Sequence, residues 1–73
     1  MNILKLVNNN ADEMEPEIRY VNADEISGFC FFDGNTIIRT HNLAPTVITG
    51  DWTKELAIML TQIGNGKIST ITY

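Results

Sequence analysis

The chain has 73 residues, and a domain of this length buries only about 60% of the surface that its unfolded form exposes, so its core is small. Hydrophobic residues make up 44% of the sequence and charged residues 19%, which excludes the composition of a disordered chain. The net charge is -4 and the five Lys and Arg residues are scattered. Direct binding to DNA or RNA is therefore not expected, because it depends on clustered basic residues.

Cysteine content and hydropathy limit the cellular compartments in which this protein is expected. Cys30 is the only cysteine, so an internal disulfide is excluded, and a reducing cytoplasmic compartment is favoured for so small a domain. The first apolar run ends at Asn8, too early for a signal peptide, and no run approaches the roughly 18 apolar residues of a membrane span. We therefore expect a cytoplasmic protein without a membrane segment.

The N-terminal part predicts two strands joined by an acidic loop. Residues 3–7 form an apolar run typical of a strand, residues 8–16 read as loop, and residues 17–22 alternate as a second strand that Pro16 can open. Residues 23–25 then predict a turn or a single helical turn. Six of the nine acidic residues lie in this part of the chain. A solvated segment that aids solubility explains them, and a docking face for a basic partner is the alternative.

The strongest local signal is a hairpin around Asp33-Gly34. Aromatic and β-branched residues flank this dipeptide on both sides, and Asp-Gly tolerates the positive φ angles of a type I′ turn. A two-residue turn places Phe29 and Phe31 on one face with Thr36 and Ile38, and Cys30 and Phe32 on the other face with Asn35 and Ile37. If Asn35 joins the turn, these faces change. Both faces are apolar, and one helix can cover only one of them, which indicates a partner.

A further strand and one helix follow. Residues 41–45 read as loop and residues 46–49 as a strand, after which Asp51 can cap a helix over about residues 52–63, with residues 64–66 as its C-terminal stop. Apolar residues with helical spacing predict one stripe packed on the sheet. These expected core residues are Trp52, Leu56, Met59, Leu60 and Ile63.

The C-terminal residues 67–73 are rich in β-branched side chains and predict a last strand. Alone it would be an unprotected edge, so it pairs either beside the first strand or with the edge of another protomer. A 73-residue chain without cross-links, a hairpin with two apolar faces and this edge together predict a homo-oligomer.

Candidate reactive residues have simpler structural explanations. His41 is the only histidine and cannot form a Cys/His zinc site with one cysteine, so it is expected on a surface loop. Cys30 lies between phenylalanines with no basic neighbour to activate it, so it is expected as a small buried hydrophobe. Residues 64–67 resemble a phosphate loop but follow a helix instead of preceding one. No catalytic residue, metal site or cofactor is therefore predicted.

Several segments together resemble a known family. Tyr20–Ile26, Asn35–Thr40, Thr46–Ile48 and the helix with Glu55-Leu56 follow the layout of the small FlbD/SwrD-like proteins associated with bacterial flagella and swarming. The resemblance covers more than half of the chain and implies a β-meander closed by a helix, without enzymatic activity. The segments 8–16 and 67–73 depart from that layout.

The sequence predicts an α+β fold: a four- to five-stranded, mainly antiparallel meander in one domain, with one amphipathic helix on one face. We expect a non-enzymatic, acidic, oligomeric module that binds a protein partner as adaptor or inhibitor, a type of small protein that phages commonly encode. Its predicted interface residues are Phe32, Ile37, Ile68, Ile71 and Tyr73. The alternative is a protein that binds a nucleotide or metabolite at an oligomer interface through Arg19, Tyr20, Phe32 and Arg39. An enzyme is the least favoured class.

Overall fold

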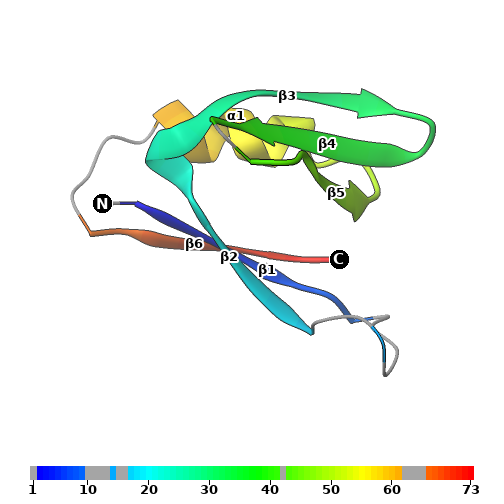
Figure 1. Ribbon diagram of the computed structural model, residues 1–73, viewed down its shortest axis with the longest axis horizontal. Coiled ribbons are helices and arrows are strands. Elements are labelled where there is room, and N and C mark those ends of the chain that lie inside the picture. The colour runs from blue at the N-terminus through cyan, green and yellow to red at the C-terminus, as the bar shows by residue number, and fades with distance from the viewer. Residues whose placement is uncertain (1, 10–13, 15–16, 42, 62–65) are drawn as a thin grey trace. The chain divides into compact units, whose positions relative to one another are not determined.

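The computed structural model describes residues 2–9, 14, 17–41, 43–61 and 66–73. These residues form six strands, one 3-10 turn and one α-helix (Figure 1). In chain order the elements are β1 (Ile3–Val7), β2 (Ile18–Asn22), the 3-10 turn (Ala23–Glu25), β3 (Ile26–Phe32), β4 (Asn35–Thr40), β5 (Thr46–Thr49), α1 (Thr53–Thr61) and β6 (Ile68–Thr72). The predicted α+β class is confirmed. The predicted single sheet is wrong, because the strands form two three-stranded sheets.

The chain divides into two compact units. The first contains Met1–Asp24 and Gly64–Tyr73, and the second contains Glu25–Ile63. The first unit therefore joins the two ends of the sequence, whereas the second is one continuous segment.

The sheet of the first unit has the strand order β2-β1-β6 (Figure 1). β1 pairs antiparallel with β2 and parallel with β6, so the C-terminal strand lies beside the first strand, which is one of the two pairings that the sequence left open. Backbone bonds continue the parallel pairing, from the Tyr73 N–H to the Val7 carbonyl (2.8 Å) and from the Asn9 N–H to the Tyr73 carbonyl (2.7 Å). The β-branched tail is thus held within its own chain.

Alternation along these strands gives the sheet two different faces. Leu4 and Leu6 on β1 and Ile71 on β6 share one face, and all three are buried. Their burial follows from the period of two along a strand, which sends every second side chain to the same side. Their strand partners Arg19, Val21 and Ser69 share this face, and the opposite face is described below.

A 3-10 turn connects the two sheets along the chain. β2 pairs with β1 and β3 pairs with β4, but β2 and β3 share no ladder in the described chain, and Ala23–Glu25 lies between them. Side chains fix this turn: the Asp24 carboxylate accepts the Asn2 backbone N–H (3.2 Å), and the Asn22 side-chain oxygen accepts the Asp24 N–H (3.0 Å). The helical turn expected over residues 23–25 is therefore present, and it ends the first sheet.

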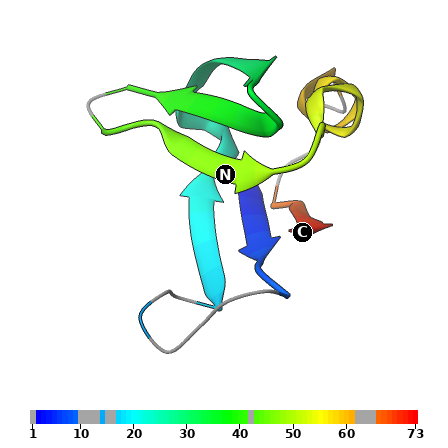
Figure 2. The ribbon, with the colours of Figure 1, turned by 90° about the vertical axis from the view of Figure 1, so that its right-hand side faces the viewer.

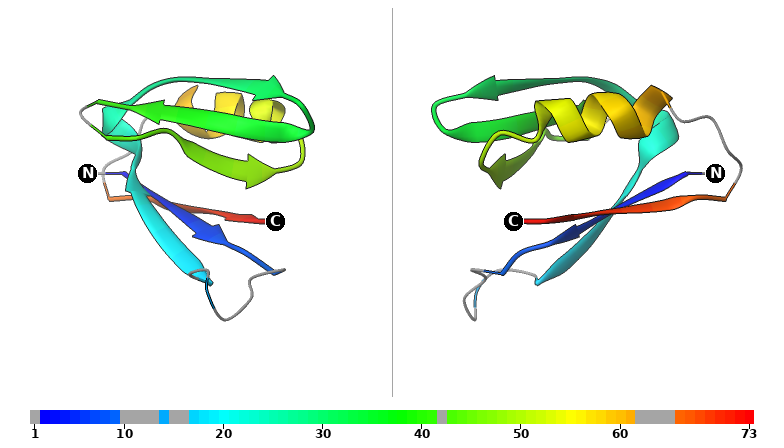
Figure 3. Two further views of the ribbon diagram at one scale, coloured as in Figure 1. Left: turned by 45° about the vertical axis from the view of Figure 1, so that its right-hand side comes forward. Right: turned by 180° about the vertical axis from the view of Figure 1, so that it is seen from behind.

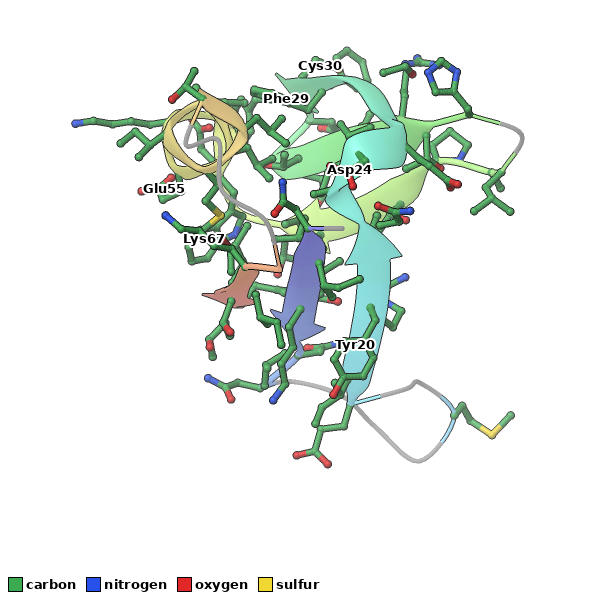
Figure 4. The ribbon with its side chains drawn as sticks, turned by 90° about the vertical axis from the view of Figure 1, so that its left-hand side faces the viewer. Tyr20, Asp24, Phe29, Cys30, Glu55 and Lys67 are labelled. Carbon is green, nitrogen blue, oxygen red and sulfur yellow. The ribbon has the colours of Figure 1, made fainter. Side chains whose placement is uncertain are left out.

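The second unit contains the hairpin and its third strand, in the order β3-β4-β5. Asp33 and Gly34 have φ angles of 53° and 79°, as a type I′ turn requires, and Phe32 pairs with Asn35 directly across the turn. The predicted hairpin is confirmed (Figure 3), and the pairs along it follow the register of a two-residue turn. Phe29 and Cys30 consequently lie on opposite faces of β3 (Figure 4).

A buried threonine connects this sheet to the helix. The Thr36 hydroxyl donates to the Gly50 carbonyl (2.7 Å) and accepts the Trp52 N–H (2.8 Å). Gly50 has a φ angle of 94°, and a Cβ added there would meet the indole nitrogen of Trp52 at 3.2 Å, so both the turn and the packing favour glycine. Because Thr36 and Ile38 share a face, the helix begins on that side of the sheet.

Asp51 caps the helix as predicted. Its carboxylate accepts the Thr53 N–H (3.1 Å) and the Thr53 hydroxyl (2.6 Å). These bonds lower the pKa of Asp51 below its ordinary value of 3.8, with the hydroxyl bond contributing more than the backbone bond. The first backbone bond of the helix runs from the Leu56 N–H to the Trp52 carbonyl (2.9 Å), so Asp51 lies one residue before the position that starts the ladder.

The packing of α1 differs in part from the predicted stripe. The helix lies beside the β3-β4-β5 sheet, where Figure 2 views it end-on, and Leu56 is completely buried together with Ile38 and Ile48. Trp52 and Met59 are half-buried, and Leu60 retains 36% of its exposure, so placing Leu60 in the core is wrong. Ile63 and the stop over residues 64–65 lie outside the described residues. The described helix begins within one residue of its predicted start, and Leu56 is its buried contact.

Candidate interaction surfaces

One face of the β3-β4-β5 sheet is largely exposed and apolar at its centre. We call it the Ile37 face, and it consists of Gly28, Cys30, Phe32, Asn35, Ile37, Arg39, Val47 and Thr49. Ile37 on the middle strand is half-buried between Cys30 on β3 and Val47 on β5. Phe32, near the hairpin turn, is 69% exposed. Such a face can bind another apolar surface.

The two ends of the Ile37 face differ in charge. Arg39 lies at one end, opposite Gly28, and is exposed. Phe32 and Asn35 form the other end, and the exposed Asp33 lies next to Phe32 in the hairpin turn. Asn35 and Arg39 are four positions apart along β4, which corresponds to about 13 Å. The face therefore has an acidic end, an apolar centre and a basic end.

The β2-β1-β6 sheet also has an exposed face, which we call the Tyr20 face. It consists of Ile3, Lys5, Val7, Ile18, Tyr20, Asn22, Ile68, Thr70 and Thr72. Tyr20 on β2 and Ile68 on β6 are 65% and 66% exposed, respectively. Lys5 on the central strand pairs with Tyr20 and Thr70, so a charged side chain lies at the middle of this face. The middle of the Ile37 face is instead the aliphatic Ile37.

The four residues predicted to bind a small ligand belong to different surfaces. Arg19 and Tyr20 are neighbours on β2 and therefore point to opposite faces of the first sheet. Arg19 donates a hydrogen bond to the Tyr73 hydroxyl (2.8 Å), in a partly buried position. Arg39 and Phe32 share the Ile37 face but lie at its two ends. Neither pair brings its guanidinium and its aromatic ring together at one point.

The five predicted interface residues are also distributed over both units. Phe32 and Ile37 lie together on the Ile37 face, and Ile68 lies on the Tyr20 face. Ile71 is 1% exposed, so this side chain belongs to the core of its unit. Tyr73 is half-buried and is held through its hydroxyl and its backbone. Phe32, Ile37 and Ile68 are thus the accessible members of the set.

Cys30 and His41 are both exposed. The expectation of a buried Cys30 is wrong, because its side chain points to the Ile37 face and not toward the helix. His41 follows β4 on the surface, as predicted, and its backbone N–H donates to the Glu25 carbonyl (3.0 Å). Among the described residues, no three His, Cys, Asp or Glu side chains are grouped to hold a metal ion.

The acidic segment is described only in part. Asp12, Glu13 and Glu15 lie outside the described residues. Glu17, Asp24 and Glu25 are exposed, as a solvated segment requires. The Asp24 carboxylate also accepts the Asn2 side-chain amide (3.4 Å), so one acid of this segment helps to hold the start of β1.

Three surface residues were not singled out from the sequence. Ile18 shares the Tyr20 face and Val47 shares the Ile37 face, and each is close to half exposed. Gly28 supplies a position without a side chain beside Arg39. The alternation of Ile18 with Tyr20 was a usable signal for the first. The register set by the Asp33-Gly34 turn was a usable signal for Gly28, because it pairs Gly28 with Arg39. The position of Val47 depends on the pairing of β4 with β5, which the sequence alone does not specify.

Comparison with known proteins gives no relative for these surfaces. No family model, curated protein or solved structure matches the chain. Within the described residues, no helix has the length and apolar character needed to span a membrane.

Proposed function

We propose that this protein is a non-enzymatic interaction module that binds a protein partner in the cytoplasm and acts as an adaptor or an inhibitor. The observation that carries the proposal is the Ile37 face, where Phe32 is 69% exposed beside Ile37 and Cys30. An exposed aromatic next to aliphatic side chains, with charges at the rim, has the composition of a protein-binding surface. The resemblance to the FlbD/SwrD-like proteins favours the same non-enzymatic role.

Affinity capture with a matched pair of variants tests this proposal. Phe32→Lys places a charge at the exposed aromatic position, and Thr70→Lys adds the same charge at an exposed strand position of the Tyr20 face. We expect the wild-type chain and Thr70→Lys to retain the same protein from a host lysate, and Phe32→Lys to lose it. Calorimetry with that purified protein then measures the affinity. Equal retention by Phe32→Lys would refute the role of the Ile37 face.

Small-ligand binding is the second proposal, and its support is weaker. Arg39 and Phe32 share a face, which favours a site for an anionic aromatic ligand, but about 13 Å of strand separates their positions. A native mass spectrum of the protein isolated from its host distinguishes the two proposals. A bound small molecule would favour the second, and a bound protein the first.

A further inference from the structure

On the Ile37 face, residues lie at equal distances along the strands on either side of one central pair. Cys30 and Ile37 are paired across β3 and β4 and form this central row. Two residues to either side of Cys30 on the same face lie Phe32 and Gly28. Two residues to either side of Ile37 lie Asn35 and Arg39. A half-turn about an axis along the row exchanges Phe32 with Gly28, and Asn35 with Arg39.

The two positions that are exchanged on β3 carry side chains of very different size, Phe32 and Gly28. Phe32 is the large exposed side chain of the face, at 69% exposure. Gly28 has no side chain, and a Cβ added there would meet no atom within 4 Å. In a second copy turned about the row axis, the Phe32 ring lies over Gly28 of the partner subunit. The largest protrusion thus meets the open position, and it does so twice in a symmetric pair.

The exchanged positions on β4 differ in charge. Arg39 of one copy lies over Asn35 of the partner subunit, with Asp33 of the partner subunit in the adjoining turn. An arginine side chain can donate to both an amide oxygen and a carboxylate. The alternative half-turn, about an axis along β4, would place Arg39 against Arg39 of the partner subunit. Two arginines facing each other across an interface repel, so the half-turn about the Cys30–Ile37 row is preferred.

We infer that the Ile37 face binds a second copy of this chain, in a two-fold dimer whose axis runs along the Cys30–Ile37 row. The inference rests on the proposed interaction role and names its partner. In this dimer the β3-β4-β5 sheets of the two copies pack face to face about 10 Å apart with their strands aligned, as in a β-sandwich. The contact is isologous and closes after two copies, so it does not propagate into a fibre.

A residue exchange between Phe32 and Gly28 tests the arrangement. The single variants Phe32→Ala and Gly28→Phe remove the protrusion or fill the open position, and each is expected to raise the dimer dissociation constant about tenfold or more in analytical ultracentrifugation. The double variant Phe32→Ala/Gly28→Phe moves the protrusion to the other end and is expected to restore the dimer to within about threefold. A double variant no stronger than the weaker single variant would overturn the inference.

Thermal melting accompanies these measurements. Gly28 has ordinary φ and open space around it, so Gly28→Phe is expected to keep the fold. If Gly28→Phe unfolds, Arg39→Gln and Asp33→Asn replace it in a double-mutant cycle. Their effects on dimerisation are expected to be non-additive, because each removes one side of the same contact. Additive effects would overturn the inference.

Two controls separate this inference from the proposed function. Ile68→Lys charges the Tyr20 face and should leave the dimer intact, whereas dissociation by Ile68→Lys alone would show that the copies associate through the other sheet. A wild-type chain that is monomeric at about 100 μM, well above the dissociation constants of stable dimers, overturns the inference. Retention of a different protein through Phe32 would still support the proposed function in that case.

Cross-linking through Cys30 tests where the two-fold axis of the dimer lies. Sheets packed at about 10 Å hold the two Cys30 Cα atoms too far apart for a relaxed disulfide, but within reach of a short bismaleimide. Cross-linked dimer is expected from the wild-type chain and not from Phe32→Ala at the same concentration. A wild-type dimer that the reagent does not link would place Cys30 away from the axis and overturn the arrangement.

Discussion

The two sheets are built from the same number of strands but in opposite ways. β3, β4 and β5 follow one another in the chain and are separated by only a few residues. β1 takes its two partners from a neighbouring segment and from the far end of the sequence. Contacts between distant segments require a large part of the chain to be ordered first. The comparison indicates that the second unit can form from local signals, whereas the first depends on an encounter of the chain ends.

Deletion of residues 68–73 is the most severe test of this comparison. The deletion removes β6 and leaves Leu4 and Leu6 without their neighbour Ile71, so we expect the amides of β1 and β2 to lose hydrogen-exchange protection. The amides of β3 and β4 should keep theirs, because the second unit contains no residue of the deleted strand. Equal loss in both units would show that they unfold as one cooperative body.

Truncation of the buried helix contact is the next largest effect. Leu56→Ala removes a side chain with 0% exposure, and we expect a loss of about 2 to 5 kcal/mol in the free energy of unfolding. Leu60→Ala on the same helix removes the same atoms at 36% exposure, and its cost should stay below about 1 kcal/mol. Urea denaturation measures both. Similar losses for the two variants would contradict the packing of α1.

Thr36 allows a finer test inside the second unit. Thr36→Val preserves the shape of the side chain but removes the hydroxyl, leaving the Gly50 carbonyl and the Trp52 N–H without that partner. We expect a loss of about 1 to 3 kcal/mol in urea denaturation. Thr36→Ser is the control, because it keeps the hydroxyl and removes only a methyl group. If valine is as stable as threonine, this bridge contributes nothing to the connection between β5 and α1.

The smallest expected effect is the pH dependence of the Asp51 cap. Because its pKa is lower in the folded chain than the ordinary value of 3.8, folding favours the ionised carboxylate. Its contribution to stability is therefore complete above that ordinary value and is lost as the pH falls through the lower folded pKa. The melting temperatures of wild type and Asp51→Asn, compared across this range, should converge under acid conditions. A constant difference would exclude this role of the charge.

The sequence predicted the second unit better than the first. Asp33-Gly34 specifies its own turn, and the turn specifies the register of β3 with β4, so the sequence alone assigns Phe32 and Ile37 to one face. The exposure of Leu60 was not predictable in this way. Helical spacing shows which residues share a stripe, but not how far the sheet extends beneath it.

The errors in the first unit have a common cause. A strand pattern gives the alternation of side chains but not the partner strand, so it did not indicate which face of β6 holds Ile71. The pattern also did not separate a meander from two sheets, because the 3-10 turn over Ala23–Glu25 is set by bonds from Asn2 and Asn22. Pairing between strands that are distant in the chain and hydrogen bonds of polar side chains are therefore the features that could not be predicted from this sequence.

The parallel pairing of β1 with β6 has a consequence for synthesis on the ribosome. β1 is translated before the second unit and β6 after it, so one edge of β1 stays unpaired until β6 has been made. The hairpin and its helix, in contrast, are complete in sequence before β6 is made. We therefore expect the nascent protein to form its second unit first and its first unit only after β6 has been synthesised, with Leu4 and Leu6 accessible to chaperones in the interval.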